Sequence, residues 1–419
     1  MLSLKQSFLL MLIAFVVTSL VYPYVLAFAR KRNIVDNPNA RKLQRVPVPL
    51  MGGATVFAGM LVASVVAFFM CGEARVLIIL GLLLAMYLLG LWDDVKDITP
   101  AIRFLVEILE VWLIILLLGV EINDFHGLWG LHAIPDAVSV PLSIVAGVGI
   151  INAINLIDGV DGYCSSYGMM TCIVYAIIFY FAGDKGLFTL ALIGIGAMLP
   201  FFFHNVFGKT SKMFLGDGGS LLLGTLLVLF TFSALSSNSV CKSYGADGVS
   251  LVAICLAILA VPIFDTLKVM IFRLFRGQSP FHPDKTHLHH LFIEMGFTHL
   301  ATSFIIVLTN VFIIAALVLA WRMGASVDLQ VYIVVGLSLL FTWGFYFFME
   351  AQCRKKNGHG SKFYRQCRRF GELRLISAAP IWRFFRRVVD SRLLGGKPRV
   401  RRPSDTPAVS KSRPDPRIQ

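Results

Sequence analysis

Long apolar stretches, separated by short polar segments, make up most of the first 350 residues of the chain. A hydrocarbon core about 30 Å thick needs roughly 20 apolar residues for each helical crossing. Eleven stretches approach that length, and they predict an all-α, polytopic membrane protein with about eleven transmembrane helices. By residue number the stretches are 7–29, 50–70, 76–92, 102–120, 138–157, 167–183, 186–204, 220–235, 250–272, 301–321 and 329–348.

The first stretch also has to be weighed against a signal peptide. It is longer than the usual apolar region of such a peptide, and no small-residue cleavage site precedes the charged segment that begins at Arg30. We interpret this stretch as a spanning helix.

The composition agrees with a membrane protein, and the positions of the few charged residues indicate where its chemistry lies. Hydrophobic residues make up 57% of the chain and charged residues only 15%, with a mean hydropathy of +0.76. We expect the central parts of the stretches to be almost free of charge, with Asp265 and Lys268 as the exceptions, placed to pair on one helix face.

A transporter would carry polar groups near the bilayer midplane, often in two related halves, and the sequence shows no internal repeat. The pattern therefore favours chemistry in the loops.

Basic residues are divided unequally between the two sides of the predicted bundle. The odd-numbered loops and their helix ends collect 14 Lys and Arg, whereas the amino terminus and the even-numbered loops collect five. Cytoplasmic loops of membrane proteins carry the excess of Lys and Arg. The sequence therefore predicts that the odd-numbered loops face the cytoplasm.

The segment after the last stretch is strongly basic. It holds the other 19 of the 38 Lys and Arg, beside four acids. A juxtamembrane basic segment gains about 1 kcal/mol per charge from anionic lipids, so we expect those lipids as partners and no nucleic acid. Residues 381–387 mix aromatic residues with arginines, as an interfacial helix does. We divide the chain into a membrane domain, 1–350, and a basic cytoplasmic tail, 351–419, that is partly disordered.

The third loop places three carboxylates within five residues. On a continuing helix Asp93, Asp94 and Asp97 would crowd together and repel one another unless a cation neutralises them. Solvated carboxylates that cap a helix end are the alternative interpretation.

The fifth and seventh loops add further oxygen ligands. Asn155 is followed by two Asp-Gly steps, at Asp158 and Asp161, which project oxygens from a turn. Asp217 lies in a glycine-rich segment that leads into an apolar helix, where free N–H groups favour phosphate and a carboxylate favours magnesium. An ordinary turn and a glycine-rich helix cap are the alternatives.

The ninth loop carries His287, His289 and His290, with Arg273 upstream. Zinc is disfavoured because neither an HExxH segment nor a CxxC pair accompanies the histidines. Imidazole and guanidinium groups that donate to phosphate, or that act in acid–base chemistry, fit better beside so many acids.

Together the four loops predict a phosphoryl-transfer site on one face of the membrane. Oxygen-only ligands suit Mg²⁺, with Mn²⁺ as the alternative, and Mg²⁺ is typically held by one or two carboxylates plus substrate phosphates. Cations and N–H donors would spread the charge of a pyrophosphate substrate. The second reactant is expected to be a lipid phosphate, because the site lies where the helices meet the cytosol.

These segments resemble the signature segments of the polyprenyl-phosphate N-acetylhexosamine-1-phosphate transferases. The similarity covers roughly residues 30 to 300. The matching segments are Asp93-Asp94-x-x-Asp97, Asn155-x-x-Asp158-Gly-x-Asp161-Gly, Leu215-Gly-Asp217-x-Gly-Ser220 and Pro283-Asp-Lys-x-His287-Leu-His289-His290. The first loop adds Asp36-Asn37-Pro38, Arg41-Lys42 and Pro49-Leu50-Met51-Gly52-Gly53.

Within that family the chain is most similar to the bacterial undecaprenyl-phosphate N-acetylglucosaminyl 1-phosphate transferases. The resemblance implies an enzyme of the bacterial inner membrane, with its active site and tail in the cytoplasm. It implies transfer of GlcNAc-1-phosphate from UDP-GlcNAc to undecaprenyl phosphate, with release of UMP, as the start of lipid-linked surface-glycan synthesis. Another UDP-N-acetylhexosamine, or UDP-MurNAc-pentapeptide, is the alternative donor, and a lipid-linked-sugar transporter is a remote one. A homodimer is left open.

The resemblance also implies roles for individual residues. The catalytic residues would be Asp93 and Asp94, which deprotonate or orient the lipid phosphate, together with His287. Asp217 would bind Mg²⁺, with Asp161 as a second ligand or neighbour. The substrate-binding residues would be Arg45, Asn155, Asp158, Arg273, His289 and His290.

Overall fold

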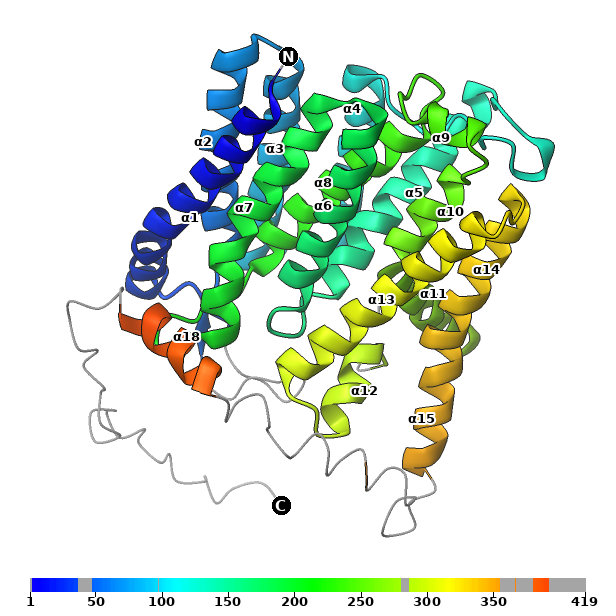
Figure 1. The fold of residues 1–419 in the computed structure, drawn as a ribbon. Helices are drawn as coiled ribbons and strands as arrows, with labels where there is room; N and C mark the ends of the chain where they lie inside the picture. The colour runs from blue at the N-terminus through cyan, green and yellow to red at the C-terminus, as the bar shows by residue number, and fades with distance from the viewer. Residues whose placement is uncertain are drawn as a thin grey trace, which may run out of the picture.

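The computed structural model describes residues 2–36, 47–96, 98–279, 286–354, 366 and 380–391. Figure 1 shows a bundle of long helices with α12 and α18 at one end, drawn lowermost. We call this end the site end. The helices are α1 (Leu4–Arg32), α2 (Gly52–Cys71), α3 (Arg75–Lys96), α4 (Pro100–Leu118), α5 (Asp136–Leu156), α6 (Tyr163–Ala182), α7 (Lys185–Phe207), α8 (Gly216–Leu235), α9 (Lys242–Ala246), α10 (Leu251–Ile258), α11 (Ala260–Phe275), α12 (Leu288–Glu294), α13 (His299–Arg322), α14 (Val327–Leu339), α15 (Phe345–Arg354) and α18 (Pro380–Ser391).

The remaining elements are short. Strands β1 (Val35–Asp36) and β2 (Val48–Pro49) pair antiparallel at the site end, with Val35 opposite Pro49. A 3₁₀ turn, η1, covers Leu128–Gly130, and a π-helical turn, η2, covers Leu340–Gly344 and joins α14 to α15.

Each of the eleven predicted stretches forms a helix or a bent or continuous set of helices, so the all-α class is confirmed. Within the described ranges, nine helices are long and apolar enough to cross a membrane, and the bent pair α10–α11 adds a tenth. Helix α4 occupies the remaining stretch and is long enough, but it carries Arg103, Glu107 and Glu110. The expectation that the spans are almost free of charge, apart from Asp265 and Lys268, is therefore wrong for α4.

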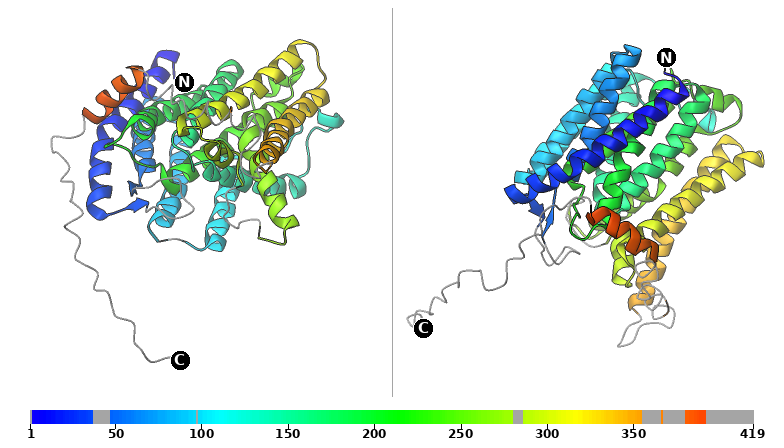
Figure 2. Two further views of the ribbon diagram at one scale, coloured as in Figure 1. Left: turned by 90° about the horizontal axis from the view of Figure 1, so that it is seen from below. Right: turned by 60° about the vertical axis from the view of Figure 1, so that its left-hand side comes forward.

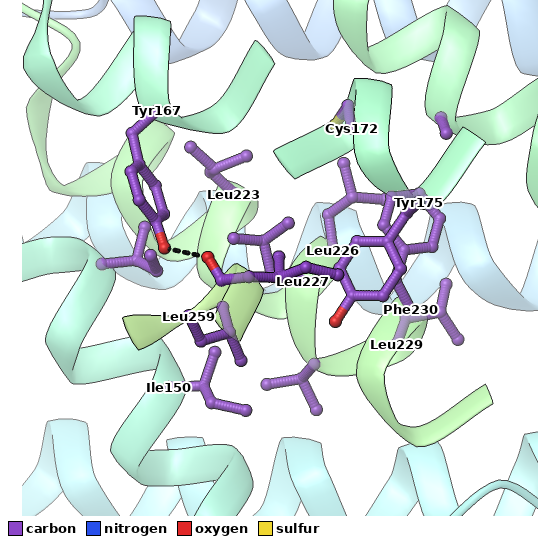
Figure 3. Close-up of a cluster of buried hydrophobic side chains, with 14 of the residues drawn as sticks. Ile150, Tyr167, Cys172, Tyr175, Leu223, Leu226, Leu227, Leu229, Phe230 and Leu259 are labelled. Carbon is purple, nitrogen blue, oxygen red and sulfur yellow. Dashed lines mark hydrogen bonds between the residues drawn. The ribbon is translucent and has the colours of Figure 1, made fainter. Parts of the chain in front are cut away.

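Helix α8 forms the centre of the bundle. Its apolar span is completely buried inside the protein and packs against α2, α3 and α5. Leu226, Leu227 and Phe230 from α8 meet Tyr175 of α6 in this core (Figure 3). Because α8 is central, its first residues lie in the middle of the site end rather than at the rim.

The bend between α10 and α11 is supported by polar groups from neighbouring helices. The two helices meet at 73°, and Pro262 cannot supply the N–H that would bond the carbonyl of Ile258. The Tyr167 hydroxyl donates to that carbonyl (Figure 3). The Asn310 amide donates to the same carbonyl. The freed backbone of a broken membrane helix must be satisfied in this way.

Candidate active site

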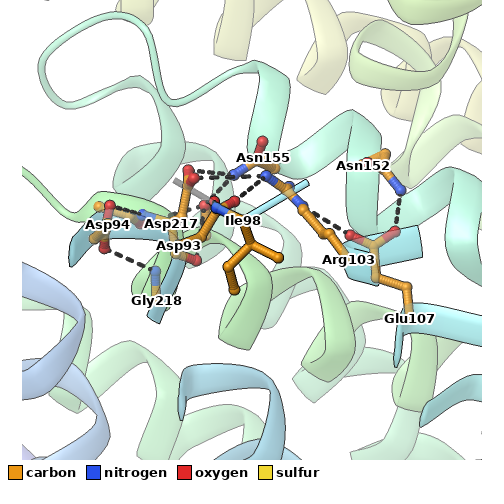
Figure 4. Close-up of polar contacts among 11 residues, drawn as sticks. Asp93, Asp94, Ile98, Arg103, Glu107, Asn152, Asn155, Asp217 and Gly218 are labelled. Atoms are coloured by element: carbon orange, nitrogen blue, oxygen red, sulfur yellow. Dashed lines mark hydrogen bonds and ion pairs between the residues drawn. The ribbon is translucent and has the colours of Figure 1, made fainter. Parts of the chain in front are cut away.

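Two acidic segments meet where α3 ends and α8 begins. Asp94 accepts hydrogen bonds from the backbone N–H groups of Asp217, at 3.0 Å, and Gly218, at 3.2 Å (Figure 4). A carboxylate at a helix N-terminus satisfies free N–H groups and interacts favourably with the helix dipole. Asp94 thereby fixes the start of α8 and the position of Asp217.

Glycines allow this close approach of α3 and α8. A Cβ atom added to Gly90 would lie 2.4 Å from the carbonyl carbon and oxygen of Asp217. Gly216 has a φ of +76°, and a Cβ there would lie 2.6 Å from Oδ2 of Asp94. Side chains at these two positions would force the two acidic segments apart.

Arg103 lies between the acids of α3 and α8. Its Nη1 atom lies 3.1 Å from Oδ2 of Asp93 and 3.5 Å from Oδ2 of Asp217 (Figure 4). Asp93 also accepts a hydrogen bond of 2.8 Å from the N–H of Ile98, which holds its carboxylate in place. The arginine thus bridges two of the predicted site residues.

The polar network continues from Arg103 along α4. Its Nε atom donates to Glu107 at 3.0 Å, and Glu107 is fully buried. Asn152 of α5 donates to the second oxygen of Glu107 (Figure 4). Both oxygens of this buried acid therefore accept hydrogen bonds from donors that the fold places there.

Asn155 and Asp158 approach the same cluster from the end of α5. The Asn155 amide donates to Oδ1 of Asp217 at 2.7 Å and to Oγ of Ser220 at 2.8 Å. Desolvation, together with the negative charges of Asp217, Asp94 and Asp161, raises the pKa of Asp158 well above its usual range. The structure brings Asn155 into direct contact with Asp217 and places Asp158 within its electrostatic reach.

Asp161 is engaged by two basic side chains. Its Oδ2 atom lies 2.6 Å from Nζ of Lys212 and 3.0 Å from Nδ1 of His299. Desolvation acts to raise the pKa of Asp161, but the hydrogen bonds and charges of His299 and Lys212 outweigh it, and the pKa is lowered. The carboxylate predicted as a second metal ligand or neighbour is thus neutralised by protein groups.

The histidine segment is held by a buried acid of α11. Nδ1 of His287 lies 2.9 Å from Oδ2 of Asp265, which also accepts from the N–H of Leu288 and pairs with Lys268 at 2.7 Å. The predicted pairing of Asp265 with Lys268 is confirmed. The Nε2 atom of His287 has no hydrogen-bond partner among the described residues.

His289 connects this segment to the turn between α5 and α6. A Cβ atom on Gly159 would lie 2.9 Å from Nε2 of His289, so the imidazole lies directly against the backbone between Asp158 and Asp161. The rings of His289 and His290 are 4.3 Å apart. Burial, with electrostatic repulsion from the neighbouring His290 and His287, holds the pKa of His289 well below its usual range.

The remaining residues of the predicted site lie in α11 or outside the described ranges. Arg273 is buried in the last turn of α11. Arg45, Asp97 and the segment 280–285 lie outside the described residues.

The donors at the start of α8 suit a hard cation. Within the described ranges, no group of three or more His, Cys, Asp or Glu side chains is arranged to hold a metal ion. Mg²⁺, however, usually takes one or two carboxylates and completes its shell with water and substrate phosphate. Asp217 fits that need, because its side chain is 37% exposed whereas that of Asp93 is 12% exposed.

Comparison with known proteins connects this geometry to a family. A model described as glycosyl transferase family 4 matches residues 76–235. A protein of Bacillus subtilis (strain 168), named a probable undecaprenyl-phosphate N-acetylglucosaminyl 1-phosphate transferase, is 32% identical over 337 residues, which cover 79% of this chain and 90% of the relative. The chain belongs to the polyprenyl-phosphate N-acetylhexosamine-1-phosphate transferase family.

Further relatives agree with this assignment. The undecaprenyl-phosphate alpha-N-acetylglucosaminyl 1-phosphate transferase of Escherichia coli (strain K12) is 27% identical over 362 residues, 85% of this chain and 93% of the relative. The protein of the same name from Yersinia pestis is 32% identical over 280 residues, 64% of this chain and 72% of the relative. This transferase is thus a multi-pass membrane enzyme that transfers a sugar 1-phosphate, and the resemblance drawn from its motifs is confirmed.

Sequence reasoning missed four polar residues that the transferase brings into the site: Arg103, Glu107, Lys212 and His299. Arg103 and Lys212 were counted only among the 14 basic residues of the odd-numbered loops that orient the bundle. An arginine followed four residues later by a glutamate, inside an apolar stretch, was a usable signal, because ionisable groups within membrane helices are costly and generally functional. His299 gave no such signal, since a lone histidine at a helix start is common.

Proposed function

We propose that the transferase moves GlcNAc-1-phosphate from UDP-GlcNAc to undecaprenyl phosphate and releases UMP. The observation that carries the proposal is the convergence of Asp93, Asp94 and Asp217 at the N-terminus of the central helix. Arg103 bridges Asp93 and Asp217 there. Relatives that align over most of their length are named for GlcNAc-1-phosphate transfer to undecaprenyl phosphate, which supports the choice of both reactants.

In this reaction an oxygen of the lipid phosphate attacks the phosphorus that carries the sugar. A new P–O bond forms to the lipid phosphate, and the bond from that phosphorus to the bridging oxygen breaks, so that UMP leaves with the bonding electron pair. The protein must hold the anionic reactants together and spread the charge that develops. Asp93 and Asp94 orient the lipid phosphate and take up its proton when it is protonated.

Cationic and N–H groups around the acids suit the pyrophosphate of the donor. Arg103 is positioned to contact it beside Asp217. Nε2 of His287, which has no partner among the described residues, would donate to phosphate when the imidazole is protonated, because Nδ1 faces the Asp265 carboxylate. Arg273, His289 and His290 are assigned to the pyrophosphate and sugar, and Asn155 and Asp158 to the nucleotide.

We assign the metal to Asp217, with Mg²⁺ as the ion and Mn²⁺ as its substitute. When bound, the ion would neutralise phosphate charge at the start of α8. Asp161 would contribute as a neighbour through Lys212 and His299, which already occupy its carboxylate. We also assign the site end to the cytoplasmic side of a bacterial inner membrane, because the loops at that end carry the excess of Lys and Arg.

A donor panel tests the identity of the sugar. Purified protein, Mg²⁺ and undecaprenyl phosphate are incubated with UDP-GlcNAc, other UDP-N-acetylhexosamines or UDP-MurNAc-pentapeptide, each labelled in the sugar. The expected result is lipid-linked label from UDP-GlcNAc in preference to the others. Preferential labelling by another donor would move the function to that sugar while leaving the reaction type unchanged.

A further inference from the structure

The helix of the basic tail, α18, is fastened to the loop that follows α7. One carboxylate oxygen of Asp390, Oδ1, lies 3.2 Å from each of the backbone N atoms of Lys209, Thr210 and Ser211. The same atom accepts from the hydroxyls of Thr210 and Ser211 at 3.0 Å each. Hydrogen bonds to a charged acceptor are the strong ones, so five donors on one carboxylate fix this loop closely.

An aromatic contact supports the same attachment. The ring of Phe385 lies 5.3 Å from the rings of both Phe203 and Phe207, at the end of α7. Figure 2 shows α18 lying across the site end of the bundle rather than continuing away from it. The hydrogen bonds of Asp390 and the Phe385 contact together hold residues from the far end of the sequence against the α7–α8 loop.

The opposite edge of this loop is held by α1. The hydroxyl of Tyr22 donates to the carbonyl of Ser211 at 2.8 Å, and Arg30 donates to the carbonyl of Thr210. The N–H groups of residues 209–211 therefore face α18, and the carbonyl groups of Thr210 and Ser211 face α1. Between them the two helices restrain both edges of a three-residue segment.

This restrained segment leads directly into the candidate active site. Lys212, the next residue, pairs with Asp161 at 2.6 Å. Asn205 forms a second link, since its amide donates to the carbonyl of Met213 and its carbonyl accepts from the N–H of Gly162. A shift of residues 209–211 would therefore move the cation that neutralises Asp161.

We propose that Asp390 is a positioning residue for the transfer reaction: α18 holds the α7–α8 loop so that Lys212 neutralises Asp161. Helix α18 is then a structural part of the enzyme and acts on the site through Lys212. The effect on turnover rests on the proposed function, whereas the effect on the loop does not.

Hydrogen exchange of the full-length protein in detergent tests the attachment itself. With Asp390→Ala, the backbone N–H groups of 209–211 should exchange several-fold faster, because they lose their acceptor. Asp136→Ala is the matched control, since it removes an exposed carboxylate at the opposite end of the bundle, and it should leave this segment unchanged. Unchanged exchange in Asp390→Ala overturns the proposal whatever the substrate is.

A double-mutant cycle tests the route through Lys212. Asp390→Ala should lower the turnover of the best donor roughly tenfold, in proportion to the coupling usual for residues of one network. Asp390→Asn, which keeps an acceptor oxygen, should recover part of the loss. In a Lys212→Met background the same Asp390→Ala change should have little further effect. Full additivity of the two changes, in proteins that are equally folded, would overturn the role through Lys212.

Failure of the proposed function gives a different pattern. If the wild-type protein uses another UDP-sugar, Asp390→Ala would still exchange faster than wild type at residues 209–211. The Asp390 and Lys212 substitutions would also still be non-additive, with that sugar as the donor. A protein that uses UDP-GlcNAc but is indifferent to Asp390→Ala would keep the function and lose the positioning role.

Discussion

The Nη1 atom of Arg103 lies 3.5 Å from Oδ2 of Asp217, although the two residues enter from different helices and are 114 positions apart in the sequence. This contact joins α4 to the first turn of the central helix. It places a permanent cation beside the carboxylate that we assign to the metal.

Replacement of Arg103 should therefore impair transfer more than it impairs folding. Arg103→Met keeps the length of the side chain but removes the charge, and it should lower kcat by roughly 10²- to 10³-fold, the usual cost of losing a charge-stabilising donor. Arg103→Lys should recover part of the activity. Lys96→Ala, an exposed basic residue at the end of α3, serves as the control. Turnover of Arg103→Met within twofold of wild type would remove the arginine from the site.

The two buried acids of α4 should respond differently to replacement by glutamine. Glu107 accepts from Arg103 with one oxygen and from Asn152 with the other, so Glu107→Gln must turn an NH₂ group toward a donor. We expect its free energy of unfolding in detergent to fall by roughly 2 to 5 kcal/mol. Glu110 has an oxygen with no partner among the described residues, and Glu110→Gln should be neutral or stabilising. Equal changes in the free energy of unfolding for Glu107→Gln and Glu110→Gln would contradict the hydrogen-bond network of Arg103, Glu107 and Asn152.

Two glycines of α3 provide a second matched pair. Gly90→Ala would place a methyl group 2.4 Å from the backbone of Asp217, which should cost roughly 1 to 3 kcal/mol of stability and displace the acids. Gly81 has open space around it, so Gly81→Ala should be neutral or stabilise the helix by about 0.5 to 1 kcal/mol. Thermal unfolding and turnover of both variants check this. A Gly90→Ala protein with wild-type values would show that the close approach of α3 to α8 is not required.

The stabilisation supplied by Asp161 should depend on pH in a definite direction. Its pKa is lowered in the folded protein, so its contribution is fully present above the ordinary value of 3.8 and is lost as the pH falls through the lower folded value. Asp161→Asn should therefore cost roughly 1 to 3 kcal/mol at neutral pH. The difference from wild type should shrink below about pH 4. A difference that grows on acidification would show that the sign of the shift is wrong.

Much of the fold was predictable because the bilayer imposes a length and a hydrophobicity on each element. The apolar stretches located all the long helices of the described bundle, including α4 despite its charges. The bend at α10–α11 was not predicted, because Pro262 alone does not show that Tyr167 and Asn310 stand ready to satisfy the freed carbonyl. That support comes from two other helices and depends on how they pack.

The candidate site was predictable as a set of residues but not as a set of contacts. Motifs placed Asp94 and Asp217 in one site, yet the bonds from the N–H groups of Asp217 and Gly218 to Asp94 follow from the close packing that Gly90 permits. Lys212 and Asp390 gave no chemical signal in the sequence, because their partners lie 51 and about 180 positions away. Pairings over such separations are set by the rotation and register of packed helices, which local patterns do not specify.

The most direct test of the account is the release of UMP from UDP-GlcNAc by the purified protein, measured with and without undecaprenyl phosphate in the presence of Mg²⁺. We predict UMP release that requires the lipid phosphate, matches the lipid-linked sugar formed, and falls at least about 10²-fold in a folded Asp217→Asn protein. Absence of UMP release with any UDP-sugar, or near-normal release by Asp217→Asn, would contradict it.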